Sequence, residues 1–339
     1  MNSVSTIISK AFCLLLLAAT FTFASGVTMD TAHAAQGKIA RMDVEFKTTD
    51  GTILRGWHYP PQKTSGKAPI IVMAHGMGAL KEMRLDAYAE VFSAAGLGVL
   101  VYDHRNFGAS DGKIRQENSP WEQIHDFRDA ITFASTLPQA DPDKIGVWGS
   151  SYSGGLAIVV TALDRRVKAV VSQVPMINGY ETIRRLVRPD KLAELQKLFA
   201  QDRLNRAQGK APAMFPITTD NPDGMGLMAS PDAWEWFTGM AKAYIPSWKN
   251  EVTLRTVEMV SEFEPGAFID RISPTPMLML VATEEYATPS DLAFKAYAGA
   301  GYPKKLIVLE GMTHFDPYVK GFDQTSAAAR DWFVEHLVR

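Results

Sequence analysis

The sequence predicts an α/β fold in which a mostly parallel, doubly wound sheet carries a helical cap insertion. Short apolar runs alternate along the chain with segments of helical periodicity, which is typical of parallel strands joined by right-handed helical crossovers. This alternation stops near residue 177 and resumes after residue 264. The interruption predicts an inserted helical cap over residues 177–264.

The predicted strands begin with a hairpin. Residues 44–49 and 53–59 flank Asp50-Gly51, a dipeptide that favours tight turns between antiparallel strands. Six later runs are short and almost entirely apolar, as in strands that helices cover on both faces. These runs are 69–74, 98–102, 144–148, 167–171, 277–281 and 306–309.

Helical periodicity fills the intervals between the runs, over residues 84–95, 121–137, 153–163, 289–298 and 322–338. Residues 177–264 are amphipathic at first and then rich in aromatic side chains, among them Trp234, Trp236 and Trp248. We expect most of these aromatic side chains to pack in the core, and a few that face the sheet to line a pocket.

The composition excludes several classes of protein. The chain has 339 residues, of which 46 % are apolar and 21 % charged, enough apolar surface to form a folded core. The formal net charge of -2 gives no overall attraction to nucleic acid. The only cysteine, Cys13, lies in the first segment, so the rest of the chain has no disulfide, thiol nucleophile or cysteine-based metal site.

That first segment, residues 1–34, has the pattern of a secretory signal peptide. Lys10 precedes a short apolar run, and Ala32-His33-Ala34 has the spacing of a cleavage site. We therefore expect a secreted or periplasmic protein with an α/β domain over residues 35–339 and no stable membrane insertion after cleavage. An uncleaved N-terminal anchor is the alternative, although the apolar run is short for a membrane span.

The strongest chemical signal is the stretch from Lys144 to Gly155. An apolar strand is followed by Gly149-Ser150-Ser151-Tyr152 and then by a helix that begins near Ser153. A sharp strand-to-helix turn with small neighbours projects a serine above a sheet as a nucleophile, which favours Ser151. Ser153 is the rival nucleophile, and an ordinary turn is the alternative without chemistry.

Two further loops follow strands in the order such a nucleophile needs. His75-Gly76-Met77-Gly78 comes after the strand 69–74, and we expect the N–H groups of Met77 and Tyr152 to form an oxyanion hole. His314 follows the last strand after Gly311, and an imidazole can accept the serine proton near neutral pH. We interpret His75 as structural.

A carboxylate must orient the imidazole. Glu284 and Glu285 both follow the strand 277–281, and we prefer Glu285 because of its spacing to Pro289. The position after the strand 167–171 offers no carboxylate, which favours the later site. We expect Asp316 to cap its loop.

Together, Gly149-x-Ser151, His75-Gly76, an acid near residue 285, His314 and the stretch from Asp103 to Gly112 resemble the α/β-hydrolase superfamily over residues 40–339. Within it, the residues 151–155 and 314–318 resemble the X-Pro dipeptidyl-peptidase-like and dienelactone-hydrolase-like serine hydrolases. The helical insert is also similar to certain bacterial esterases and fungal polyketide acyltransferase or hydrolase relatives. The resemblance implies a structural role for the Asp-x-Arg-x-x-Gly-x-Ser loop.

These observations predict a serine hydrolase that cleaves a small-molecule carboxylic ester or thioester through Ser151, His314 and Glu285, without a metal or organic cofactor. A peptidase of the X-Pro type would use the same residues on an amide. An acyl or polyketide transferase would use an acceptor other than water. A non-catalytic binding module is the alternative from another class.

Overall fold

The structure is a computed structural model that describes residues 39–62, 64–221 and 223–339. The signal peptide expected over residues 1–34 lies outside this range, so it stays a prediction. Within the described residues, we find no helix that combines the length and the apolar character required to cross a membrane.

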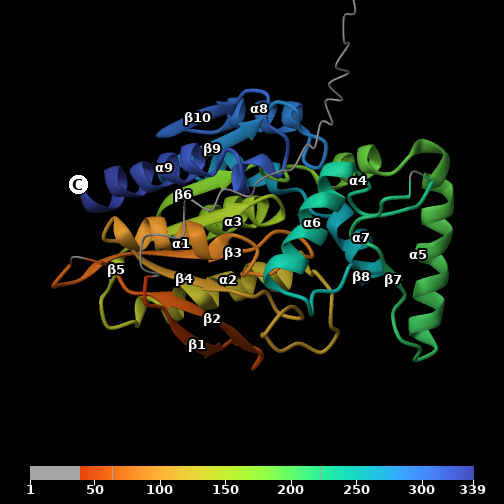
Figure 1. Ribbon diagram of the computed structural model, residues 1–339, viewed down its shortest axis with the longest axis horizontal. Coiled ribbons are helices and arrows are strands. Elements are labelled where there is room, and N and C mark those ends of the chain that lie inside the picture. The colour runs from red at the N-terminus through yellow and green to blue at the C-terminus, as the bar shows by residue number, and fades with distance from the viewer. Residues whose placement is uncertain (1–38, 63, 222) are drawn as a thin grey trace, which may run out of the picture. The chain divides into compact units, whose positions relative to one another are not determined.

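The central sheet has eight strands in the order β1-β2-β4-β3-β5-β6-β9-β10 (Figure 1). β2 pairs antiparallel with both β1 and β4, and every other neighbouring pair is parallel. The predicted α/β fold with a mostly parallel sheet is therefore confirmed. The strands are β1 (Met42–Lys47), β2 (Ile53–Tyr59), β3 (Ala68–Ala74), β4 (Gly98–Tyr102), β5 (Ala140–Ser150), β6 (Val167–Gln173), β9 (Met277–Ala282) and β10 (Lys304–Leu309).

Helices cover the sheet because its central strands are buried on both faces. Figure 1 shows α1 (Leu85–Ala94) and α9 (Phe322–Phe333) on one face, with α2 (Pro120–Ser135) and α3 (Tyr152–Leu163) behind the sheet. α8 (Ser290–Gly299) packs against β9. Under the first face, the ring of Tyr88 from α1 lies 4.9 Å from that of Trp148 on β5, so large aromatic side chains fill the contact between helix and sheet.

The segment between β6 and β9 forms helices rather than strands of the central sheet. It contains α4 (Gly179–Leu186), α5 (Leu192–Ala207), α6 (Pro231–Tyr244) and α7 (Leu254–Ser261), with a small ribbon of β7 (Met214–Phe215) and β8 (Val252–Thr253). Figure 1 shows these elements gathered at one end of the central sheet. The indole N–H of Trp248 donates to the carbonyl of Gly78, at 2.8 Å, and so ties this segment to the loop after β3.

The structure differs from the sequence prediction at several boundaries. β5 continues past Trp148 because Gly149 and Ser150 pair with Ser172 and Gln173 on β6. α3 begins at Tyr152, which agrees with the helix start expected near Ser153. The last helix changes to a π-helical turn over Val334–Val338, and the β7–β8 ribbon was not predicted.

Candidate active site

The three residues predicted as nucleophile, base and acid lie just beyond the carboxyl ends of β5, β10 and β9. Ser151 follows β5, His314 lies in the loop after β10, and Glu285 lies in the loop after β9. Carboxyl ends of parallel strands meet at one edge of a sheet, which is where open α/β folds bind ligands. The fold therefore brings together three side chains that are far apart in the sequence.

Ser151 lies in a strained turn whose close backbone contacts require a glycine at position 149. Its backbone has φ 60° and ψ -124°, which is uncommon for a residue with a side chain. Gly149 faces the carbonyl of Ser153 so closely that a Cβ atom there would collide with it. The backbone N–H of Ser151 donates to the carbonyl of Gln173 at 2.9 Å, and the turn is thereby fixed to β6.

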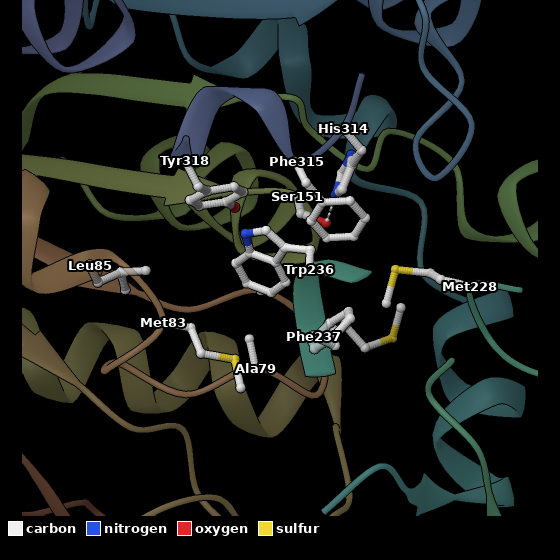
Figure 2. Close-up of a pocket in the computed structure, with 12 residues that line it drawn as sticks. Ala79, Met83, Leu85, Ser151, Met228, Trp236, Phe237, His314, Phe315 and Tyr318 are labelled. Atoms are coloured by element: carbon white, nitrogen blue, oxygen red, sulfur yellow. Dashed lines mark hydrogen bonds between the residues drawn. The ribbon is translucent and has the colours of Figure 1, made fainter. Parts of the chain in front are cut away.

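A continuous chain of hydrogen bonds connects the three side chains. Ser151 Oγ lies 2.9 Å from Nε2 of His314 (Figure 2), and Nδ1 of His314 lies 2.8 Å from Oε2 of Glu285. The carboxylate can only accept, so Nδ1 carries a hydrogen and Nε2 is left to accept the proton of Ser151. The imidazole and carboxyl side chains are only 2 % and 1 % exposed, which keeps the chain of hydrogen bonds away from competing water.

The carboxylate of Glu285 is itself held in place. Its Oε1 accepts from the backbone N–H groups of Ala287, at 2.7 Å, and Thr288, at 2.9 Å. Oε2 is thereby directed at the imidazole. Glu284, the neighbouring candidate, is exposed to solvent, and the structure does not bring it to His314.

The structure gives Ser153, the rival nucleophile, different partners. Its buried hydroxyl donates to the carbonyl of His75 and lies 2.9 Å from Nε2 of His104. Nε2 of His75 accepts from the backbone N–H of His104 at 3.0 Å, so both rings act as structural links between the loops after β3 and β4. Burial lowers the pKa of both imidazoles, which keeps them neutral.

The two residues predicted to supply the oxyanion hole lie close to the nucleophile. Tyr152 is the first residue of α3, where N–H groups have no partner within the helix. Met77 lines the same cavity as Ser151, and within the described chain no hydrogen bond uses its N–H as donor. A Cβ at Gly76 would lie 3.5 Å from that of Ser151, which shows how closely this loop passes the serine.

A buried ion pair between Lys81 and Asp103 connects the loop after β3 to the loop after β4. Asp103 accepts from the backbone N–H of Lys81 at 3.0 Å and from its Nζ at 2.6 Å. Burial alone would lower the pKa of Lys81, but the carboxylates of Asp103 and Glu82 outweigh it and raise that pKa. Arg105 forms a bidentate pair with the buried Asp126. Asp103 and Arg105 of the Asp-x-Arg-x-x-Gly-x-Ser stretch thus form ion pairs that hold the surrounding structure together.

Sequence reasoning assigned no role to Tyr318, which joins the loop of His314 to the turn of Ser151. Its buried hydroxyl donates to Ser150 Oγ at 2.5 Å, and Ser150 Oγ also accepts from Gln173 Nε2 at 3.2 Å. Asp316, in the same loop, accepts from the backbone N–H of Thr313 at 2.6 Å, as expected of a capping residue. No local sequence signal indicates this contact, because Tyr318 and Ser150 are far apart in the chain and meet only in the folded protein.

A cavity opens beside Ser151 and His314 (Figure 2). Its volume is about 20 Å³, roughly the space that one water molecule needs. The lining is mainly apolar, and α6 contributes Trp236 and Phe237 to it. The other lining residues are Gly76, Met77, Ala79, Met83, Leu85, Met228, Phe315 and Tyr318.

The described residues show no metal site. No group of three or more His, Cys, Asp or Glu side chains among them is arranged to hold an ion.

Comparison with known proteins places this chain in a family. Residues 50–261 match the model of the X-Pro dipeptidyl-peptidase (S15) family. A thiohydrolase from Eupenicillium brefeldianum is 30% identical over 279 residues, which are 81% of this chain and 88% of the relative. The polyketide transferase af380 from Aspergillus fumigatus is 35% identical over 255 residues, or 74% and 82% of the two chains.

A solved structure supports the same assignment. The α/β hydrolase GrgF from Penicillium sp. sh18 superposes with a TM-score of 0.77 at 27% identity, covering 88% of this chain and 100% of the other. The resemblance noted in the sequence is thereby confirmed at the level of fold and family. The chain is an α/β hydrolase and belongs to the X-Pro dipeptidyl-peptidase (S15) family.

Proposed function

We propose that this protein is a serine hydrolase that cleaves carboxylic esters or thioesters through an acyl-enzyme. Ser151 Oγ attacks the carbonyl carbon while Nε2 of His314 takes the hydroxyl proton, and Glu285 stabilises the resulting imidazolium. The alcohol or thiol then leaves with that proton. Water attacks the acyl-enzyme in the same way, so the carboxylic acid is released and the Ser151 hydroxyl is restored.

The N–H groups of Met77 and Tyr152 would donate to the oxygen that becomes negative at each attack. Both groups belong to the backbone, so their positions do not depend on the rotamer of a side chain. One such donor is typically worth about 10²–10³ in rate. We therefore assign the loop after β3 as much importance as the three side chains.

The single observation that carries the proposal is the chain of hydrogen bonds from Ser151 through His314 to Glu285, at 2.9 and 2.8 Å, beside a cavity. Nucleophile, base and orienting acid in that order are what acyl transfer by a serine requires. A serine outside such a chain is a poor nucleophile, since its hydroxyl has no base to take the proton.

The lining of the cavity favours an apolar acyl group. None of the described residues that line it carries a carboxylate, so the amino terminus of a peptide would find no counter-charge there. This favours esters and thioesters over the peptides of the family's name. A relative named thiohydrolase that is 30% identical to this chain supports thioesters as one class of substrate.

Transfer of the acyl group to an acceptor other than water is the second candidate. It is favoured by the relative named polyketide transferase, which is 35% identical to this chain. The two outcomes share the acyl-enzyme and differ only in the second nucleophile. Small alcohols added to the assay separate them, because a transferase yields a new ester where a hydrolase yields free acid.

The experiment compares Ser151→Ala with Ser153→Ala on p-nitrophenyl esters and acyl thioesters of increasing chain length. We expect Ser151→Ala to lose turnover and labelling by a fluorophosphonate, and Ser153→Ala to retain both. Turnover by Ser151→Ala would refute the assignment of the nucleophile. Absence of both turnover and labelling in the unmodified protein would favour a non-catalytic binding module.

A further inference from the structure

The loop after β3 meets the inserted segment at Gly78, next to the predicted oxyanion donor Met77. The indole N–H of Trp248 donates to the carbonyl of Gly78 at 2.8 Å. A Cβ atom at Gly78 would lie 2.6 Å from Cδ1 of Ile217, a fully buried side chain of the same segment. The inserted segment therefore packs directly against the backbone that would bind the oxyanion.

Residues 76–79 form a tight turn with Met77 and Gly78 at its centre. The backbone N–H of Ala79 donates to the carbonyl of Gly76 at 3.2 Å. Gly78 has φ 66°, the positive value that the third residue of a type II turn requires and that glycine adopts readily. The carbonyl of Gly76 therefore points into the turn.

The same carbonyl has a second donor in His75. Nε2 of His75 accepts from the backbone N–H of His104, so the neutral ring carries its hydrogen on Nδ1 and donates to the Gly76 carbonyl at 2.9 Å. In a planar trans peptide group, the C=O and N–H bonds point in opposite directions. The Met77 N–H belongs to this peptide group, so it points away from both donors.

Two peptide groups thus link the indole to the Met77 N–H. The indole of Trp248 donates to the carbonyl of the Gly78–Ala79 peptide group. The N–H of that group donates to the carbonyl of the Gly76–Met77 peptide group, whose own N–H is the predicted oxyanion donor. Hydrogen bonds in such a chain polarise one another. Trp248 is therefore connected to the oxyanion donor without touching the substrate.

The indole of Trp248 is itself held in place. It is half-buried, and its ring stacks on that of Phe237 with centroids 5.3 Å apart and planes at 13°. Two residues further along, Asn250 accepts from the backbone N–H of Thr218 at 3.0 Å and donates to its carbonyl at 2.8 Å. Thr218 follows Ile217, so the two parts of the inserted segment that contact the turn are joined to each other and form one support.

We propose that Trp248 is a positioning residue for the proposed reaction, whose indole N–H fixes the turn over residues 76–79 so that the Met77 N–H faces the oxyanion. The inserted segment then supports one oxyanion donor, whereas the other, Tyr152, begins a helix of the α/β domain. This inference deepens the proposed function and rests on it for the role of the Met77 N–H.

The test removes the N–H and leaves the ring. In Trp248→benzothienylalanine, introduced at that one codon, a sulfur atom replaces the indole nitrogen and its hydrogen, and the stacking on Phe237 is kept. We expect kcat on a p-nitrophenyl ester to fall about tenfold to a hundredfold, a large part of the 10²–10³ that one oxyanion donor is typically worth. KM should stay within about twofold, because the lost interaction acts in the transition state. Trp248→Phe, which also removes the N–H, replaces this variant if circular dichroism shows that it does not fold.

An alkyl trifluoromethyl ketone reports on the oxyanion hole directly. Ser151 Oγ bonds to its carbonyl carbon, Nε2 of His314 takes the hydroxyl proton, and the π electron pair of the carbonyl moves to its oxygen, which becomes the oxyanion. The inhibition constant should rise by the factor by which kcat/KM falls. The apparent pKa in the pH profile of kcat/KM should stay the same, because the contacts of His314 are intact. A purely structural defect would instead lower the number of active sites and leave the inhibition constant unchanged.

Trp234→benzothienylalanine is the matched control. Trp234 lies on α6 of the same inserted segment, is half-buried like Trp248 and lies outside the cavity lining. This variant should keep the kcat, the KM and the inhibition constant of the unmodified protein.

If the unmodified protein is active and the folded Trp248 variant keeps its kcat and inhibition constant, the role of Trp248 is overturned and the proposed function stands. Equal losses in the Trp234 variant, or a shifted pKa in the profile of the Trp248 variant, would overturn that role as well, since the effect would then lie outside the oxyanion hole. An unmodified protein that neither turns over esters or thioesters nor binds the ketone would refute the proposed function, and the role of Trp248 with it.

Discussion

Replacing Glu285 with glutamine tests the proposed catalytic chain through the tautomer of His314. Oε1 of Glu285 accepts two backbone N–H bonds, at 2.7 and 2.9 Å, so the amide oxygen of the glutamine takes that position. The reverse orientation would leave both N–H groups facing an NH₂ group, at about 1–3 kcal/mol for each unsatisfied donor. The NH₂ group therefore faces Nδ1 of His314.

An NH₂ group beside Nδ1 forces the imidazole hydrogen onto Nε2, which faces Ser151 Oγ at 2.9 Å. Nε2 can then no longer accept the serine proton. The wrong tautomer costs about 10⁴ in kcat in a serine protease with this chemistry, which corresponds to about 5.5 kcal/mol of transition-state stabilisation. We expect Glu285→Gln to lower kcat on a p-nitrophenyl ester by about 10³–10⁴, with little change in KM.

The matched control is Glu284→Gln, one residue away. Its side chain is exposed and does not contact His314, so kcat should stay within about twofold of the unmodified protein. The assay is initial-rate kinetics at pH 7.5, with circular dichroism to confirm that both variants are folded. If Glu285→Gln kept more than a tenth of the activity, or if Glu284→Gln lost most of it, the reasoning would be wrong.

Two further outcomes follow from buried side chains. Tyr318→Phe removes the 2.5 Å hydrogen bond to Ser150, whose Oγ still accepts from Gln173. We expect about 0.5–1.5 kcal/mol less stability in urea and a severalfold lower kcat. Unchanged values of both would show that the contact does not position the loop of His314. Burial lowers the pKa of His58, His75 and His104 in the folded protein, so the unfolded chain binds protons more readily below their ordinary pKa of 6.5. The free energy of unfolding should then fall as the pH is lowered from 7.5, with a slope approaching about 1.4 kcal/mol per pH unit for each histidine that stays neutral. Burial raises the pKa of Asp126, Glu82 and Glu117, which adds a slope of opposite sign at lower pH. The decisive interval in urea unfolding is therefore pH 7.5 to 6.5, where a free energy that does not fall would contradict the prediction.

Most strands of the fold could be predicted from local sequence because burial on both faces leaves a continuous apolar run. Residues 98–102 are one such run, and the strand has those bounds. β5 (Ala140–Ser150) extends beyond the predicted 144–148 at both ends. At its carboxyl end Gly149 and Ser150 are not apolar, and they extend the strand only by pairing with β6. The partner residues on β6 lie more than twenty positions further along the chain, so the local pattern of apolar residues gives no information about this pairing.

The chemistry of the site could be predicted for a related reason. Ser151, Glu285 and His314 each follow an apolar run, and the order of such runs along the chain determines which loops meet at the edge of a parallel sheet. The sequence offered Glu284 and Glu285 at the same place, and spacing alone separates them weakly. What distinguishes them is the pair of backbone N–H groups that holds Glu285, a feature of the folded loop.

Sequence alone could not tell which aromatic residues of the inserted segment line the cavity, because that depends on contacts between distant elements. Trp234 and Trp236 are the same residue type and lie on the same helix, α6. Two residues along a helix turn a side chain by about 200°, so only one of the two can face the loop of His314. Packing of α6 on that loop selects Trp236, whose ring stacks on Phe315. The reaction can thus be inferred from the order of loops along one chain, whereas the choice of substrate depends on how the inserted helices pack over those loops.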